Sequence, residues 1–371
     1  MQKTNILHVT FDMPIAGTEQ VIYNLIAHSD PNRYHHSLCC IEAPVGAIGE
    51  KLKALGYVLY SFQRRPGFDR QLIRDIRKVL KEAQIDIVHC HQYSPYVYGL
   101  FASLGLGKKV IFTEHGRLYP DTSSWKRRRI NPLMQYVTDQ ITCISKATIE
   151  ALVQVENFSR KKVALLYNGV TPVESDVQAN IDIRERFGIP LDAIVFGTVS
   201  RLDPIKNQAM MLNAFKQVHK RQPNSYLVFV GDGSERPKLE SQAQDLGVRT
   251  HTIFAGFQVA PQAYFNAIDI FLLSSFSEGT SMTLLEAMSC GLPSVATRVG
   301  GNSEVLEDGL TGMLTPNDDA DAFASAMQAF VESLELRQKI GRQAAETFKE
   351  RFDVRVMVEQ YHALYRRLLA P

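Results

Sequence analysis

The stretch that decides the fold runs from Phe271 to Gly301 and reads FLLSSFSEGTSMTLLEAMSCGLPSVATRVGG. An apolar strand, Phe271 to Leu273, leads into a polar turn, then into a helix that opens near Ser281 and a second strand over Ser294 to Thr297. This order predicts one βαβ unit. Because open α/β sheets bind ligands in the crevice at the carboxyl ends of their strands, the stretch is expected to carry a ligand site.

Two carboxylates stand on either side of that turn. Glu278 lies in the loop, and Glu286 lies eight residues on, in the second turn of the helix. Gly279 sits between them, where the backbone must turn tightly. Carboxylates accept hydrogen bonds from hydroxyl groups, so the pair suits a sugar or a ribose. The alternative is that both are solvated side chains on an ordinary helix.

The pattern resembles the signature of a known enzyme family. Glu278-x7-Glu286, followed by Ala287-Met288 and Gly291-x-Pro293, is similar to the motif of retaining GT-B glycosyltransferases, specifically family 4. The resemblance covers almost the whole chain. It implies an α/β fold of the GT-B type, with two Rossmann-like domains facing a central cleft. It also implies that the first Glu lies near the donor sugar and that the second binds the ribose hydroxyls.

Length and composition agree with two globular domains. The chain has 371 residues, of which 45% are hydrophobic and 22% are charged. A net charge of +2 gives no case for nucleic acid as a partner. No apolar run is long enough to span a membrane and no signal sequence precedes the first strand, so a cytoplasmic location is expected. Five cysteines without CxxC spacing predict buried reduced thiols and not a zinc site.

Strands alternate with helices in both halves, which favours parallel, doubly wound sheets. The resemblance assigns residues 1–172 to an N-terminal Rossmann-like acceptor-binding domain, onto which the C-terminal helix, residues 355–371, packs back. Residues 171–180 are polar and aperiodic, as expected of a linker. Residues 181–352 are assigned to a C-terminal Rossmann-like domain that binds the nucleotide-sugar donor.

Two positions in the first half are candidate site residues. Gly17 follows a strand and precedes a helix that Thr18 is expected to cap, an arrangement that offers backbone N–H groups to a phosphate. The alternative is that Gly17 only makes a turn. His115, within TEHG at the end of a strand, is implied by the resemblance to reach the donor sugar near its anomeric carbon. A structural histidine is the alternative.

Two cations follow the strand over residues 194–199. Arg201 and Lys206 are five residues apart and can bracket a diphosphate without a metal ion. The resemblance implies that they neutralise the pyrophosphate and stabilise the departing nucleoside diphosphate. No metal and no cofactor are therefore expected. The motif Asp319-x-Asp321 resembles a metal-binding DxD, but it opens a helix, where acidic residues favour the helix dipole.

Further donor-site residues are implied by the resemblance. Gly231, in a Gly-Asp-Gly turn after a strand, lines the donor site, and Phe257 lies where the nucleotide base is received. A third glycine is missing after that turn, which argues against NAD. Gly300 and neighbouring residues are expected to shape the cleft floor. The helix N-terminus beside the sugar or phosphate is formed by Gly279, Thr280 and Ser281.

A basic and aromatic segment, Trp125–Arg129, holds the only tryptophan next to four cations. In family members that act at membranes, such a patch meets anionic lipid or a lipid diphosphate, and each cation contributes ~1 kcal/mol near such a surface. A solvated helix start is the alternative.

The resemblance implies a retaining glycosyltransferase that moves a sugar from a nucleoside diphosphate donor, with UDP-sugars favoured, to an acceptor hydroxyl. Expected products belong to polysaccharide, glycolipid or lipid-linked oligosaccharide synthesis, so the partners are the nucleotide sugar and a glycan or lipid-linked acceptor. The expected catalytic residues are His115, Arg201, Lys206 and Glu278. A cytoplasmic enzyme, peripheral on the inner face of the cell membrane, would follow. Two alternatives stay open: a non-catalytic nucleotide-sugar-binding protein, and a GT-B epimerase or phosphorylase.

Overall fold

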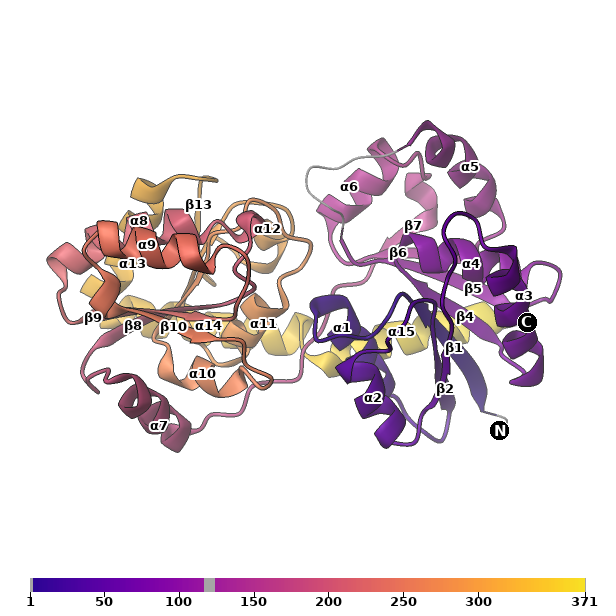
Figure 1. Cartoon of the computed structure of the whole chain (residues 1–371), viewed down its shortest axis with the longest axis horizontal. Helices are drawn as coiled ribbons and strands as arrows, with labels where there is room; N and C mark the ends of the chain where they lie inside the picture. Colours follow the sequence, from indigo (N-terminus) through magenta and orange to yellow (C-terminus); the bar gives the residue numbers. More distant parts are fainter. Residues whose placement is uncertain (1–2, 117–123, 371) are drawn as a thin grey trace. The chain divides into compact units, whose positions relative to one another are not determined.

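The computed structural model describes residues 3–116 and 124–370 of the chain (Figure 1). The chain divides into two compact units. Unit 1 comprises Met1–Gly169 and Val354–Pro371, and unit 2 comprises Val170–Asp353. Each unit has a parallel sheet with helices packed on it, and each has its own hydrophobic core.

Unit 1 contains a seven-stranded parallel sheet in the order β3-β2-β1-β4-β5-β6-β7. The chain builds outward from β1 in one direction and then resumes at β4 on the other side of β1, which creates a topological switch point. The strands are β1 (Thr4–Thr10), β2 (Tyr34–Cys40), β3 (Val58–Ser61), β4 (Ile87–His91), β5 (Lys109–Glu114), β6 (Gln140–Cys143) and β7 (Val163–Leu165).

The helices of unit 1 connect these strands, and the last helix of the chain joins them. They are α1 (Gly17–Ala27), α2 (Ala47–Ala54), α3 (Arg70–Glu82), α4 (Tyr93–Ser103), α5 (Trp125–Tyr136), α6 (Lys146–Gln154) and α15 (Val354–Leu369), with a short 3₁₀ turn at Arg160–Lys162. The expected cap of α1 by Thr18 is wrong: Ala16 occupies the N-cap position and makes no side-chain bond there. Thr18 lies inside the first turn, so its hydroxyl cannot serve as the N-cap acceptor.

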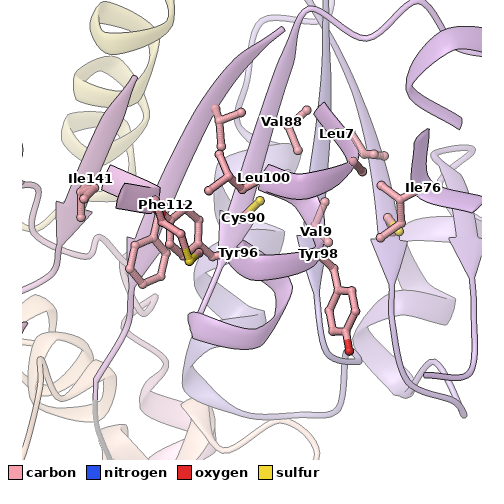
Figure 2. Close-up of a cluster of buried hydrophobic side chains, with 14 of the residues drawn as sticks. Leu7, Val9, Ile76, Val88, Cys90, Tyr96, Tyr98, Leu100, Phe112 and Ile141 are labelled. Atoms are coloured by element: carbon pink, nitrogen blue, oxygen red, sulfur yellow. The ribbon is translucent and has the colours of Figure 1, made fainter. Parts of the chain in front are cut away.

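Side chains alternate between the two faces of this sheet. One face is apolar and packs against α3 and α4, as Figure 2 shows for Leu7, Val9, Val88 and Phe112. Tyr96 of α4 stacks on Phe112 with ring centroids 4.2 Å apart and an interplanar angle of 9°. The opposite face, here called the polar face, carries most of the buried polar side chains of the strands, among them His8, His89 and Thr113, next to apolar ones such as Ile6 and Ile111. Unit 1 is therefore built around a sheet with one largely apolar face and one face that buries many polar groups.

The five cysteines are free thiols, four of them buried. Cys39 belongs to the same apolar cluster as Leu7 and Val9, whereas Cys40 packs in a separate cluster with Met13 and Ile22. The expectation of buried, reduced thiols holds for these two adjacent residues on opposite sides of β2. Burial raises the pKa of Cys40 to about 12, which keeps the thiol protonated.

The C-terminal helix α15 is part of unit 1 and lies alongside α1 (Figure 1). Its buried side includes Tyr361 and Tyr365. The ring of His362 stacks on Tyr34 of β2 at a centroid distance of 4.2 Å. The helix therefore adds aromatic side chains to the polar side of the unit 1 sheet.

Unit 2 contains a six-stranded parallel sheet in the order β10-β9-β8-β11-β12-β13, with its switch point between β8 and β11. Its strands are β8 (Ile194–Val199), β9 (Ser225–Val230), β10 (Thr252–Gly256), β11 (Ile270–Leu273), β12 (Ser294–Thr297) and β13 (Met313–Thr315). Its helices are α7 (Val177–Phe187), α8 (Gln208–Arg221), α9 (Arg236–Asp245), α10 (Gln262–Ala267), α11 (Met282–Ser289), α12 (Asn302–Val305), α13 (Ala320–Glu332) and α14 (Leu334–Arg351), with 3₁₀ turns at Pro204–Lys206 and Arg249–His251.

The linker is shorter than the predicted residues 171–180. Residues 171–176 are irregular, but α7 begins at Val177 because the Asp176 side chain accepts a hydrogen bond from the Ala179 amide and caps the helix. Among the described residues, no helix combines the length and the hydrophobicity that crossing a membrane requires.

Candidate functional site

The predicted donor-site residues of unit 2 gather around the carboxyl ends of neighbouring strands. Arg201 and Lys206 follow β8, Gly231 follows β9, and Glu278 follows β11. Strands β8 and β11 are adjacent, and the sheet order reverses between them. This is the position at which open α/β sheets bind their ligands.

The Lys206 ammonium contacts the Glu278 carboxylate directly. Nζ lies 2.6 Å from Oε1, and the hydroxyl of Ser275 donates to the same oxygen at 2.5 Å. The two charged side chains are 20% and 9% exposed, so the pair is shielded and both partners are held in one geometry. Sequence reasoning assigned these residues to different parts of the donor and did not predict their contact.

Two serines that sequence reasoning missed hold this pair in place. Ser274 donates to the Lys206 carbonyl oxygen at 2.8 Å, and Ser275 holds Glu278. Both serines are buried directly after β11. The signal in the sequence was the pair of small polar residues at the carboxyl end of an apolar strand.

Arg201 is far more exposed than Lys206 and has a different acidic partner. Its side chain is 78% exposed and pairs with Asp203 at 2.9 Å. An exposed pair of this kind is worth about 0–1 kcal/mol, so the guanidinium can leave it for a better anion. Asp203 Oδ1 is buried and has no hydrogen-bond partner within the described ranges. Arg201 and Lys206 therefore have different partners, Asp203 and Glu278.

Two glycines allow close backbone approach at the site. A Cβ at Gly300, where φ is +46°, would lie 1.9 Å from the Glu278 carbonyl oxygen, and Gly301 donates its amide to that oxygen at 3.0 Å. A Cβ at Gly231 would lie 2.0 Å from the Ser200 carbonyl oxygen. Gly300 thus supports the loop that presents Glu278. This role is more specific than the one expected from the sequence, which was to shape the cleft floor.

Glu286 lies on α11, partly buried, and accepts a hydrogen bond from the Gln262 side chain at 3.3 Å. Burial raises the pKa of Glu286 to about 7, and the Gln262 hydrogen bond opposes that rise. The two signature carboxylates therefore have separate partners, with a cation for Glu278 and a neutral amide for Glu286.

The remaining predicted positions in unit 2 lie in the loops after β10 and β11 and at the start of α13. Ser281 caps α11 by accepting from the Leu284 amide, and it is buried together with Thr280, which follows Gly279. Phe257 follows β10 and is 58% exposed. The DxD motif acts as predicted at a helix start, because the Asp319 side chain accepts from the Ala322 amide and caps α13.

In unit 1, Gly17 is the first residue of α1 and is exposed. Glu19 in the same turn is buried, and burial raises its pKa to about 7. His115 follows β5, and its Nε2 lies 2.8 Å from Nδ1 of His91. Burial lowers the pKa of His115 to about 3, so the imidazole is neutral, as the sequence-based hypothesis requires.

The contact between Gly300 and Glu278 generates a prediction with a matched control. Gly300→Ala places a methyl group on the Glu278 carbonyl oxygen, whereas Gly309→Ala meets nothing within 4 Å although Gly309 also has a positive φ. Backbone strain alone costs about 1–2 kcal/mol, which Gly309→Ala measures. Gly300→Ala is expected to lower the free energy of unfolding by a further ~1–3 kcal/mol.

Gly300→Ala should also speed amide hydrogen exchange in the loop after β11, as read by mass spectrometry, and Gly309→Ala should not. Equal destabilisation and equal exchange in the two variants would show that Gly300 does not support the Glu278 loop.

Comparison with known proteins places both halves of the chain in glycosyltransferase families. Residues 180–347 match the family "Glycosyl transferases group 1", and residues 15–174 match "Glycosyltransferase Family 4". N-acetyl-alpha-D-glucosaminyl L-malate synthase of Bacillus anthracis is 26% identical over 84% of this chain and 82% of its own length. An Escherichia coli UDP-Gal:alpha-D-GlcNAc-diphosphoundecaprenol alpha-1,3-galactosyltransferase is 27% identical over 70% of each protein.

Solved structures agree on the fold. Crystal structures of Anabaena HepE in complex with UDP and with UDP-glucose superpose with TM-scores of 0.87 and 0.86 at 22% identity. The UDP complex covers 99% of this chain and 100% of HepE. With two Rossmann-like units, and with both halves matching glycosyltransferase families, this chain belongs to the family 4 glycosyltransferases of the GT-B fold.

Proposed function

We propose that this glycosyltransferase moves a sugar from a UDP-sugar to an acceptor hydroxyl, with retention of configuration at the anomeric carbon. The observation that carries the proposal is the ion pair of Lys206 and Glu278 at the adjoining ends of β8 and β11. An ammonium has three N–H groups, so pairing with Glu278 leaves donors for a phosphate oxygen. A carboxylate has several acceptor sites, so Glu278 retains capacity for sugar hydroxyls.

The two cations take complementary roles in this proposal. Lys206 is already positioned, whereas the exposed Arg201 exchanges Asp203 for the diphosphate when the donor binds. Together they offset the charge that develops on the departing diphosphate, which is a transition-state effect and needs no metal ion. We expect the leaving diphosphate itself to help deprotonate the acceptor hydroxyl.

The other predicted residues complete the donor site. We assign Glu286 to the ribose hydroxyls and Phe257, an exposed aromatic ring after β10, to the base. The amides at the start of α11, with Gly231 directly after β9, line the path of the sugar and diphosphate. In unit 1, we assign His115 to the reacting face of the sugar and Gly17 to the donor.

The comparisons support a UDP donor and a lipid-linked acceptor. HepE binds UDP and UDP-glucose, and the E. coli relative is named for UDP-galactose and a diphosphoundecaprenol-linked acceptor. We therefore place the product in polysaccharide, glycolipid or lipid-linked oligosaccharide synthesis.

The test of this function is release of free nucleoside diphosphate from a panel of nucleotide sugars, with and without EDTA, in the presence of candidate acceptors. We expect release from one UDP-sugar, unaffected by chelation. Lys206→Ala should lower kcat by about 10²–10³-fold, because it removes charge stabilisation of the leaving group. Lys216→Ala, on the exposed side of α8, is the control and should leave kcat unchanged.

Loss of activity with EDTA would contradict the metal-independent mechanism. Binding of every nucleotide sugar without turnover would favour a binding protein. Visible absorbance of a pyridoxal phosphate adduct in the purified protein would favour a phosphorylase.

The raised pKa of Glu286 predicts pH-dependent donor binding. A ribose hydroxyl donates best to an ionised carboxylate, so binding releases the proton that Glu286 holds below about pH 7. Donor affinity should therefore fall about tenfold between pH 8 and pH 6, by linkage. Titration calorimetry with the donor identified above measures this slope.

Glu286→Gln should bind more weakly and lose the pH slope, while Glu332→Gln on the exposed side of α13 should keep it. A wild-type affinity that does not change over this pH range would refute the ribose assignment.

We also propose that α5 rests on an anionic membrane surface. Trp125, Leu133 and Tyr136 are 64%, 72% and 84% exposed, and they share one side of the helix. Lys126 and Arg129 lie on the same side, with their cationic groups 5.9 and 5.2 Å from the Trp125 ring. Apolar side chains flanked by cations on one face are typical of helices that lie in the membrane interface.

The other two cations of this segment have structural contacts. Arg127 packs over Tyr93 at 4.3 Å and pairs with Glu156 at 3.6 Å. Arg128 donates to the carbonyl oxygens of Gln154 and Val155. The predicted four-cation patch is therefore reduced to Lys126 and Arg129, with the exposed apolar side chains added.

Replacing both Lys126 and Arg129 with Gln should weaken binding to phosphatidylserine-containing liposomes by ~2 kcal/mol, or about 30-fold. The control is Lys78→Gln with Lys81→Gln, two exposed cations on α3. Sedimentation with liposomes measures both. Undiminished sedimentation of the α5 variant would remove the membrane proposal.

A further inference from the structure

The polar face of the unit 1 sheet holds a row of buried histidines. His36 on β2, His8 on β1, and His89 and His91 on β4 are all 3% exposed or less. The strand register puts His8 beside His89, and His91 beside Thr113 of β5. His115 follows two residues after Thr113 and continues the row. The row therefore crosses four neighbouring strands and ends at a predicted catalytic residue.

Four of these imidazoles form one hydrogen-bonded chain. His36 Nδ1 lies 2.9 Å from His8 Nε2, and His8 Nδ1 lies 3.0 Å from His91 Nε2. His91 Nδ1 lies 2.8 Å from His115 Nε2. Each link joins an Nδ1 to an Nε2 in the same direction. The free ends, His36 Nε2 and His115 Nδ1, are buried and have no hydrogen-bond partner in the part of the chain that the structure describes.

This geometry constrains the protons. A neutral imidazole has one N–H group and one bare nitrogen, so it can donate one ring hydrogen bond and accept one. His8 and His91 use both nitrogens within the chain, so each must donate to one neighbour and accept from the other. All three hydrogen bonds can form only if the four histidines are all Nδ1–H or all Nε2–H.

The four hydrogen-bonded histidines are neutral. Burial lowers the pKa of His8, His36 and His91 well below 6.5, as it does for His115. The titratable side chains near the four bonded histidines include His89, whose ring lies next to Tyr361 and Tyr365, and, around His36, Tyr34, His35 and His362. None of the ion pairs among the described residues involves the four chain members.

A metal site is the competing explanation. One nitrogen from each of His8, His89 and His91 lies within 4.8 Å of the others, a spacing that a metal ion could use. Every ring nitrogen of the three, however, already has a hydrogen-bond partner. His89 contacts the Tyr365 hydroxyl at 2.9 Å and the Thr113 hydroxyl at 2.7 Å. A metal would have to break part of this network.

We propose that His36, His8 and His91 are positioning residues that act as one tautomeric unit with His115. The tautomer of His36 at one end sets whether His115 Nδ1 donates or accepts a hydrogen bond at the other end. A ligand oxygen that only accepts selects Nδ1–H in all four rings, and a ligand group that only donates selects Nε2–H. The coupling between the tautomers of the four rings follows from their hydrogen bonds. Its effect on a donor sugar rests on the function proposed above.

The test is NMR of the full-length protein labelled with ¹⁵N-histidine and purified in EDTA. Ring-nitrogen shifts distinguish protonated from bare nitrogens, and couplings across N–H···N bonds identify bonded pairs. We expect four neutral rings of one tautomer at pH 7 and three such couplings. His8→Leu should abolish the two couplings to residue 8 and keep the link from His91 to His115. His89→Leu, equally buried but outside the chain, should keep all three.

Different tautomers among the four rings, or an imidazolium at pH 7, would overturn the proposal. So would shifts on adding Zn²⁺ that mark His8, His89 and His91 as ligands. If His8→Leu does not fold, the wild-type spectrum still decides. Because no step involves a nucleotide sugar, this result is independent of the sugar-transfer assay.

Discussion

The ion pair between Lys206 and Glu278 joins two strands that are far apart in sequence, at the one place where the sheet of unit 2 reverses its order. A shielded pair is stable only when its geometry and its additional hydrogen bonds offset the loss of water. Ser275 supplies such a bond, Ser274 fixes the lysine backbone, and Gly300 lets the neighbouring loop approach Glu278.

Unit 1 also buries polar groups that need hydrogen bonds to offset the loss of water, but these groups are neutral. A sheet covered on both faces leaves no water for its polar side chains, so those side chains must satisfy one another. Histidine suits this position because one ring both donates and accepts. The imidazole chain from His36 to His115 is one result, and the separate hydrogen bonds of His89 to Thr113 and Tyr365 are another. Between the two ends of this chain every ring nitrogen is satisfied, and the chain connects the interior of the unit to His115.

Much of the architecture was predictable from local pattern. Alternating apolar runs and helical stretches gave strand positions close to the observed ones, as for Ser294–Thr297, because the two periods differ so clearly. The Glu-x7-Glu motif with its glycines pointed to the family, since few folds need those residue types at that spacing. The linker was less predictable, because Asp176 starts α7 through one capping bond within a polar segment.

By itself the sequence determined the fold class, the family and the residue types at the ends of the strands, because these depend on periodicity and on short motifs. Only the tertiary structure decided which groups meet. It paired Lys206 with Glu278, left Arg201 exposed with Asp203, and gave Glu286 a neutral partner and a raised pKa. It also aligned four histidines from four strand positions into one chain. Those outcomes depend on strand order, register and burial, which bring together residues that no local stretch of sequence connects.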